Sequence, residues 1–386
     1  MPSSIAELAG GIALLLFSLA MVRAGIQRAC GGELRRLLAA GTCNRLYAFG
    51  AGTVAAALLQ SSTATALMAT SFVGRGMLPV ATGLAILLGA DVGSTLAVQV
   101  LRLDLHWLGP LLLAGGTAAF LGARNQRITE AGRVAVGIGL LLLALAMIIG
   151  ASAPLRDAPW AGAVAATLAA KPLVGLIAGG ILAWIAHSSL SIVLLIVSLA
   201  STGALPLPAA LALVIGANIG GTLPALALAA SEPPAARRLP LGNLLFRSIG
   251  AAGAFLALPW LPDFIPGADN AHRIVNFHTG FNLAIAIVFL SLTGPFARLC
   301  ARLLPDRPAP DRPGTPRYLD RSGVTTPPVA LACAAREALR MGDIVAEMLD
   351  KSFLVLRDDD RRLLDEVERM DDDIDRLNEA IKLYLA

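Results

Sequence analysis

The chain has 386 residues, of which 56% are hydrophobic and 15% charged, and its formal net charge is +4. With a mean hydropathy of +0.70, this composition excludes an ordinary soluble globular protein and predicts a protein that crosses a membrane several times. The four cysteines are scattered without a metal-binding spacing, so structural disulfides are not expected.

The hydrophobic runs that reach the length of about 20 residues needed to cross a bilayer are distributed along most of the chain. In chain order they cover about residues 5–21, 79–101, 105–123, 134–152, 205–230, 239–260 and 274–299. The first run lacks the cleavage context of a signal peptide, and we expect it to be a retained span.

An internal repeat relates two parts of this apolar region. At one constant offset (188 − 61 = 127), Ser-Ser at 61–62 corresponds to Ser-Ser at 188–189, and Gly-Ala-Asp-Val-Gly-Ser-Thr at 89–95 corresponds to Gly-Ala-Asn-Ile-Gly-Gly-Thr at 216–222. Matches between such polar and glycine-rich segments are far more informative than matches between Leu- and Ala-rich helices. We therefore interpret them as a true repeat.

The topology follows from the crossings in one repeat. In the first repeat, the runs at 5–21, 79–101 and 105–123 each cross the membrane once. Residues 44–74 are interrupted at 60–63 and are expected to enter and leave the membrane on one side. Each repeat therefore has three crossings, and because that number is odd the second copy is inverted. The expected fold class is an all-α integral membrane protein with two inverted-topology repeats, each containing a re-entrant helical hairpin, plus one extra span and a cytoplasmic helical hairpin. Most Lys and Arg residues then lie on the cytoplasmic side, with the N-terminus outside and the C-terminus in the cytoplasm of a bacterial inner membrane.

The domain organisation has four expected parts. Residues 1–127 form transmembrane repeat 1, and residues 128–303 form repeat 2 plus the final span. Residues 304–329 are rich in proline and predict an extended linker. Residues 330–386 hold fifteen acidic and nine basic residues and predict a soluble helical tail.

The hydroxyl-rich break at residues 60–63 suits ion binding. A helix N-terminus inside a membrane offers free amide groups and a positive dipole end to an anion, and unwound carbonyls and hydroxyls suit a cation such as sodium. The alternative is that the Ser and Thr side chains bond to their own helices or hold helices together. Two aligned copies favour a site, and the substrate-binding candidates are Gln60, Ser61, Ser62, Thr63, His187, Ser188 and Ser189.

Asp91 lies deep within an apolar run, and an intramembrane carboxylate is a candidate functional residue because its isolated burial is costly. Its repeat partner is the neutral Asn218. The alternative is a structural ion pair between Asp91 and an arginine such as Arg247. The expected ion-coupling residues are Asp91, Ser94, Thr95, Asn218 and Thr222, with sodium as the bound and co-transported ion.

These residues resemble the type II sodium/phosphate cotransporter family, in particular its bacterial form with a PhoU-like tail. The resemblance rests on Gln-Ser-Ser-Thr-Ala at 60–64, Gly-Ala-Asn-x-Gly at 216–220 and His-x-x-Phe-Asn at 278–282. It implies that the two serine motifs lie at the tips of opposed re-entrant hairpins and form the phosphate and sodium sites.

The chain departs from the family pattern at several positions. His187 stands where Gln is usual, Leu190 replaces a hydroxyl, and Asp91 replaces Asn. A second variant of the His-x-x-Phe-Asn motif at 243–247 ends in Arg247, for which direct neutralisation of phosphate and extension towards the cytoplasmic surface are both open. Arg247, His278 and Asn282 are therefore weaker site candidates.

The tail predicts an antiparallel helical hairpin that resembles half of a PhoU bundle. Apolar residues recur at helical spacing, with acidic clusters at 358–360 and 371–373. Metal binding by these clusters and a simple solvated face are both open.

The residues and the resemblance together favour a secondary transporter that moves inorganic phosphate with sodium by alternating access. No nucleophile with an aligned base and no nucleotide-binding loop is present, so an enzyme is not expected, and no cofactor is expected besides the transported ions. A proton-coupled or uncoupled transporter of another small anion, and a phosphate sensor signalling through the tail, remain as alternatives. A homodimer through the tail or the membrane part is also left open, whereas nucleic acid is not an expected partner.

Overall fold

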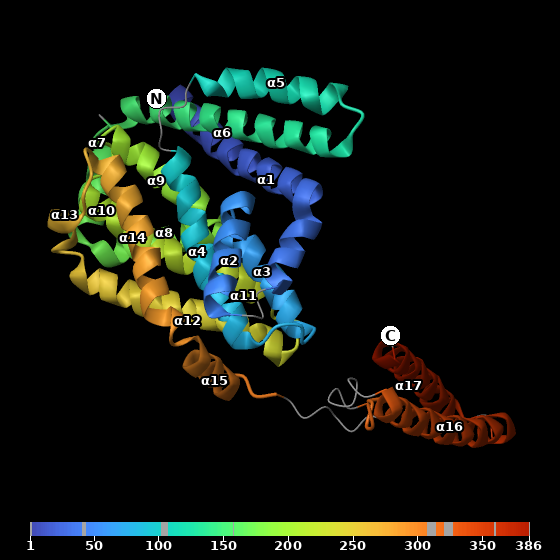
Figure 1. Cartoon of the computed structure of the whole chain (residues 1–386). Coiled ribbons are helices and arrows are strands. Elements are labelled where there is room, and N and C mark those ends of the chain that lie inside the picture. The colour runs from blue at the N-terminus through green and yellow to red at the C-terminus, as the bar shows by residue number, and fades with distance from the viewer. Residues whose placement is uncertain are drawn as a thin grey trace. The chain divides into compact units, whose positions relative to one another are not determined.

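The computed structural model describes residues 2–40, 44–101, 107–156, 158–306, 314–319, 327–358 and 360–385. Within these ranges the chain is helical and contains no β-strand (Figure 1). It divides into two compact units, Met1–Asp306 and Arg307–Ala386. The helices of the first unit are α1 (Pro2–Ala39), α2 (Arg45–Leu59), α3 (Ser62–Gly74), α4 (Val80–Leu101), α5 (Leu108–Gly122), α6 (Gln126–Arg156), α7 (Pro159–Ala170), α8 (Pro172–Ile185), α9 (Ser189–Ser201), α10 (Leu207–Gly220), α11 (Leu223–Leu228), α12 (Pro234–Ala257), α13 (Leu261–Phe264), α14 (Asn270–Leu290) and α15 (Thr293–Leu303).

Helices that can span a membrane dominate this unit. Among the described residues, 6 helical stretches are long and apolar enough: α1, α4, α6, α10 continued by α11, α12 and α14. The apolar pair α7 and α8 is bent by 108° around Lys171. The chain is thus an all-helical, multi-pass membrane protein.

Some bounds differ from the predicted runs. The run at 205–230 is interrupted between α10 and α11, where Gly220 and Gly221 weaken the helix, and the run at 274–299 is split between α14 and α15. α5 has 15 residues and is shorter than the about 20 residues of a typical span. The start of the corresponding predicted run, at 105–106, lies outside the described residues.

One order of helices occurs twice with the same spacing. α2, α3 and α4 begin at residues 45, 62 and 80, and α8, α9 and α10 begin at residues 172, 189 and 207. Each pair of starts differs by the offset found in the sequence (172 − 45 = 127, 189 − 62 = 127 and 207 − 80 = 127). The turns before α4 and α10 contain Gly76 and Gly203, whose φ angles of 69° and 77° are left-handed and favour glycine.

Close helix contacts follow the same spacing. A Cβ added at Gly52 of α2 would overlap the carbonyl of Ile86 in α4, and one added at Gly179 of α8 would overlap the carbonyl of Leu213 in α10. Glycine at these positions lets the paired helices approach closely. Glycines of α4 and α10 make the same kind of close contact with α2 and α8, and they too occupy equivalent positions of the two groups. Gly89 is equivalent to Gly216, and Gly93 is equivalent to Gly220.

α1 and α6 pack against each other with reciprocal contacts. A Cβ at Gly11 of α1 would meet Ile148 of α6, and a Cβ at Gly137 of α6 would meet Val22 of α1. The two glycines and their two partners have the same offset (137 − 11 = 126 and 148 − 22 = 126). Each helix therefore presents the same surface to the other, as expected of two elements related by a local two-fold axis.

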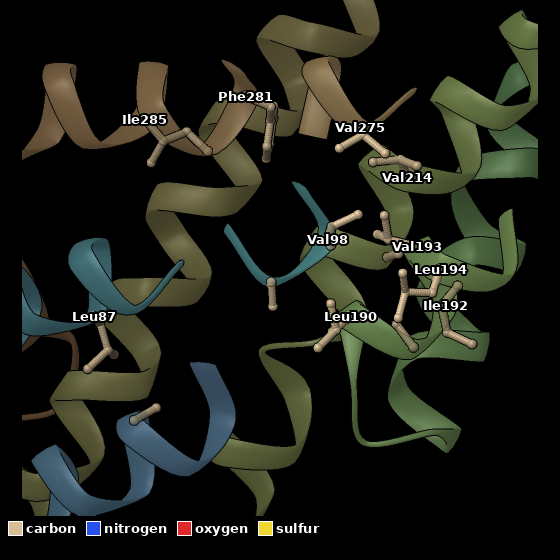
Figure 2. Packing of buried hydrophobic residues seen from close by; sticks show 14 of the residues in the cluster. Leu87, Val98, Leu190, Ile192, Val193, Leu194, Val214, Val275, Phe281 and Ile285 are labelled. Atoms are coloured by element: carbon tan, nitrogen blue, oxygen red, sulfur yellow. The ribbon is translucent and has the colours of Figure 1, made fainter. Parts of the chain in front are cut away.

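The core of the first unit joins the two groups of helices. Leu190 and Val193 of α9 lie near Val98 of α4, Val214 of α10 and Val275 of α14, all of them buried (Figure 2). α14 packs against α4, α9 and α10, and α12 packs against α3, α4 and α10. α12 and α14 thus reach the polar segments of both groups.

The second unit is a helical hairpin of α16 (Pro327–Asp358) and α17 (Arg361–Leu385). Ile344, Met370 and Leu377 form its small buried core. A hydrogen bond from Lys351 Nζ, 2.8 Å from Glu366 Oε1, lowers the pKa of the Glu366 carboxyl. Among the described residues of the chain, no three His, Cys, Asp or Glu side chains converge as a metal site would require. Asp359, in one of the acidic clusters, lies outside them.

Candidate functional site

Two breaks between helices carry the serine motifs. α2 ends before Gln60 and α8 ends shortly before His187, and both residues have φ of 50°. A left-handed residue at this position ends a helix and turns the chain. The two motifs therefore share one backbone geometry as well as similar side chains.

The serine after each break begins the next helix. Ser61 Oγ accepts a hydrogen bond from Ala64 N at 3.1 Å, and Ser188 Oγ accepts one from Ser191 N at 3.2 Å. These are N-cap contacts, in which the hydroxyl uses a lone pair and its own O–H remains able to donate. The first amides of α3 and α9 have no acceptor within their helices, and the positive end of each helix dipole lies at the break.

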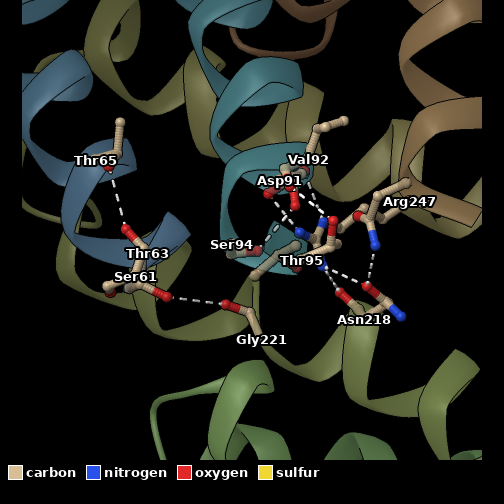
Figure 3. Close-up of polar contacts among 12 residues, drawn as sticks. Ser61, Thr63, Thr65, Asp91, Val92, Ser94, Thr95, Asn218, Gly221 and Arg247 are labelled. Carbon is tan, nitrogen blue, oxygen red and sulfur yellow. Dashed lines mark hydrogen bonds and ion pairs between the residues drawn. The ribbon is translucent and has the colours of Figure 1, made fainter. Parts of the chain in front are cut away.

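A small cavity of about 10 Å³, which we name the tip cavity, lies where the two breaks meet. Thr63 Oγ1 donates to the carbonyl of Gly221 at 3.4 Å and so links α3 to the segment after α10 (Figure 3). Gln60 Oε1 is buried without a hydrogen-bond partner. The tip cavity is lined by Gln60, Ser61, Ser62, Thr63, Ser94, Ser188, Ser189 and Leu190.

A larger cavity of about 580 Å³, which we name the vestibule, is also bordered by Thr63. Three of its lining residues are arginines, Arg23, Arg35 and Arg75, and none of the lining residues, all in described parts of the chain, is acidic. Arg23 Nε is buried without a hydrogen-bond partner. A positively charged cavity that reaches the tip residues attracts anions towards them.

Arg247 of α12 lies at the centre of a buried polar cluster. Its Nε donates to Asp91 Oδ2 at 2.8 Å, and its Nη2 forms an ion pair with Asp91 Oδ1. Its Nη1 donates to the carbonyl of Asn218 at 2.6 Å and to Asn218 Oδ1 at 3.2 Å (Figure 3). The side chains of Arg247 and Asp91 are only 2% and 4% exposed. Arg247 therefore does not extend to the surface. Of the two alternatives for Asp91, the structure contains the ion pair with Arg247.

His278 and Asn282 of α14 complete this cluster. Asn282 Nδ2 donates to Asn218 Oδ1 at 3.2 Å and to the carbonyl of His278 at 2.8 Å. Asn218 Nδ2 and His278 Nδ1 are 3.2 Å apart. Because of these hydrogen bonds, both His278 and Asn282 belong to the cluster around Asn218. Neither of them lines the tip cavity.

The remaining ion-coupling candidates are hydroxyls on α4 and at the end of α10. Ser94, Thr95 and Thr222 are buried and donate to carbonyls of their own chain segments, at 2.8, 2.7 and 2.7 Å. Their lone pairs remain able to accept a hydrogen bond or to bind a cation. Of the three, only Ser94 lines the tip cavity.

The structure thus brings most of the expected substrate residues together, with one exception. His187 is exposed, its Nδ1 lies 3.0 Å from the carbonyl of Ile185, and it lines the vestibule but not the tip cavity. Leu190 lines the tip cavity in the second motif. The vestibule arginines were not among the sequence candidates, because nothing in the local sequence distinguishes them from other basic residues at the membrane surface.

An all-helical membrane unit with polar groups gathered at two helix breaks has the architecture of a secondary transporter. The chain belongs to the Na+/Pi-cotransporter family, whose model matches residues 14–149 and 161–262, and a PhoU domain matches residues 338–386. The family and the names of its relatives describe transporters, so the protein is a transporter and not an enzyme.

Individual relatives agree with this assignment. The chain is 38% identical over 388 residues to the "Putative inorganic phosphate export protein YjbB" of Escherichia coli strain K12, covering 99% of this chain and 71% of the relative. It is 37% identical to the protein of the same name from Salmonella typhimurium, with the same coverage. It is 29% identical to the "Uncharacterized protein YqeW" of Bacillus subtilis, covering 76% of this chain and 97% of the relative. No solved structure matches the chain.

Proposed function

We propose that the protein transports inorganic phosphate across the bacterial inner membrane by alternating access, with phosphate bound at the tip cavity. The observation that supports this proposal most directly is that two serine-capped helix N-termini, at equivalent positions of the two groups of helices, line one cavity. Amide groups at helix N-termini and hydroxyl donors are a common way to bind an oxyanion. The names of the family and of its phosphate-exporting relatives support phosphate as that anion.

The size and lining of the tip cavity favour a small anion. Its volume of about 10 Å³ is room for about one water molecule and leaves no space for a large organic anion, so phosphate would bind there only when the two tips move slightly apart. Ser61, Ser62, Ser188 and Ser189 are the shared ligands of the phosphate in this proposal, and Gln60 and Thr63 complete the site from one side. In this proposal His187 acts on the phosphate from the vestibule rather than within the tip cavity.

We also propose that the two groups of helices are inverted-topology repeats and that α2–α3 and α8–α9 are re-entrant hairpins. The equal spacing of the helices and the reciprocal contacts of α1 with α6 support this arrangement. The corresponding domains are residues 1–127, 128–303, 304–329 and 330–386, with the N-terminus outside and the tail in the cytoplasm. One repeat moving against the other would then open the tip cavity to each side in turn.

Sodium is the proposed co-transported ion, in line with the family's name. Ser94, Thr95 and Thr222 offer hydroxyl oxygens for it, whereas the expected oxygens of Asp91 and Asn218 already contact Arg247. The Escherichia coli and Salmonella typhimurium relatives are named for export, and a secondary transporter runs in whichever direction the gradients set.

The test is the flux of labelled phosphate in proteoliposomes containing the full chain, under a sodium, potassium or pH gradient. We expect protein-dependent phosphate flux that competing organic anions do not block. Flux unaffected by sodium would remove the sodium part of the proposal. Absence of flux together with tight phosphate binding would favour a sensor over a transporter.

A further inference from the structure

We propose that the guanidinium of Arg247 is a tethered cation that fills the position between Asp91 and Asn218, so that no exchangeable sodium ion binds there. This inference rests on the proposed function, because it concerns how that transporter couples to ions. It places any sodium coupling at other oxygen atoms, such as the hydroxyl of Ser94 at the tip cavity.

The first argument is the set of oxygen atoms. A carboxylate, a backbone carbonyl and an amide oxygen together are typical ligands of a hard cation. Both carboxylate oxygens of Asp91, and both the carbonyl and side-chain oxygens of Asn218, contact Arg247. All three guanidinium nitrogens are used in these contacts, so the oxygen atoms that would attract sodium already face a fixed positive charge.

The second argument is electrostatic. Arg247 and Asp91 are buried and compensate each other, and the groups of α10 and α14 that complete the hydrogen-bonded cluster, Asn218, His278 and Asn282, include no second carboxylate. A sodium ion added between Asp91 and Asn218 would lie beside the guanidinium and be repelled by it in a medium of low polarity. Sodium could bind there only if Arg247 left, and removing a buried arginine from its carboxylate is costly.

The third argument is the comparison of two similar motifs. Asn243, Phe246 and Arg247 of α12 have the same spacing as His278, Phe281 and Asn282 of α14. Arg247 and Asn282 both donate to Asn218 Oδ1, at 3.2 Å each. The last residue of the motif, Arg247 in α12 and Asn282 in α14, thus donates to the same oxygen atom in both cases. Only Arg247 is charged. The positive charge therefore comes from the α12 residue itself.

The test is the thermal stability of the purified full chain in sodium chloride and in choline chloride at equal ionic strength. We expect Arg247→Ala to gain a sodium-dependent rise of a few degrees in melting temperature beyond that of the wild type, because sodium replaces the missing charge beside Asp91. The gain should disappear in the double variant Arg247→Ala with Asp91→Asn. Arg238→Ala is the matched control, since Arg238 also lies on α12 and pairs with an aspartate, Asp306, away from this cluster.

A sodium response of Arg247→Ala no larger than that of the wild type, or one that persists in the double variant, would overturn the proposal. Asp91→Asn alone provides a second test if Arg247→Ala does not fold. It should leave the sodium response of the wild type unchanged, and loss of that response would show an exchangeable sodium ion at Asp91. Because stability is measured without phosphate, these outcomes are independent of whether the protein transports phosphate.

Discussion

Gln60 and His187 share a left-handed backbone conformation, each with φ of 50°, at equivalent positions of the two groups of helices. Within the described residues they are the only non-glycine residues with positive φ. Such a conformation costs about 1 kcal/mol or more for a residue with a Cβ atom. Retaining Gln and His where glycine would be less strained indicates that their side chains contribute something besides ending a helix.

Replacing Gln60 by glycine separates these two contributions. We expect Gln60→Gly to raise the free energy of unfolding by up to about 1 kcal/mol, because glycine adopts the left-handed region without strain. Phosphate flux should nevertheless fall, since the amide that lines the tip cavity is lost. Gln60→Asn is the control, because asparagine tolerates this conformation and keeps an amide. Unchanged flux in Gln60→Gly would show that the side chain has no role at the site.

The two capping serines are expected to behave alike. Ser61→Ala and Ser188→Ala should each lower the free energy of unfolding by about 1 kcal/mol through loss of the N-cap. Phosphate flux measured in proteoliposomes should fall by more than about tenfold, because a hydrogen bond to a charged ligand is lost as well. Ser198→Ala is the matched control, since Ser198 is buried in α9 and donates to the carbonyl of Leu194 away from the tip cavity. An equal loss of flux in that control would attribute the effect to helix stability.

The close approach of α10 to α8 predicts a steric effect at Gly216. Because a Cβ there would overlap the carbonyl of Leu176, we expect Gly216→Ala to destabilise the protein by about 1 to 3 kcal/mol, and Gly89→Ala to do the same at the equivalent contact. A Cβ at Gly253 in α12 meets no atom within 4 Å, so Gly253→Ala should be neutral or slightly stabilising. Thermal unfolding of the three variants measures the difference. Equal melting temperatures would contradict the described packing.

The vestibule predicts an effect on substrate capture. Arg23→Gln removes one positive charge from a cavity that reaches Thr63, so we expect a severalfold higher KM for phosphate and a weaker dependence of that KM on ionic strength. The maximal flux should change little, because Arg23 does not line the tip cavity. Arg124→Gln serves as the control, since Arg124 is exposed and lines neither cavity. An unchanged KM in Arg23→Gln would show that the vestibule does not capture phosphate.

The helical class and the serine motifs were predictable from the sequence because both depend on local patterns. Apolar length indicated the membrane class, and the constant offset between the two copies was enough to match Ser61 with Ser188. Helix bounds were predicted less well, since neither the interruption at Gly220 and Gly221 nor the length of α1, 38 residues, is marked by a change in hydrophobicity. The inverted orientation remains a prediction.

The contacts of the site were harder to predict than its residues. The pairing of Asp91 with Arg247 joins residues 156 positions apart, and the sequence offered it only as one of two alternatives. His187 occupies the repeat position of Gln60, but its ring lines the vestibule, because a shared backbone conformation does not fix the direction of the side chain. The vestibule arginines come from α1 and from the end of α3, which only the fold brings together.

The central claim is that both serine motifs hold one phosphate ion, and equilibrium binding of labelled phosphate to the purified chain tests it most directly. We expect one phosphate per wild-type chain, an affinity lowered at least about tenfold in Ser61→Ala and in Ser188→Ala, and a non-additive effect in the double variant because the two residues share one ligand. Two independent phosphate ions per chain, or wild-type affinity in either single variant, would contradict it.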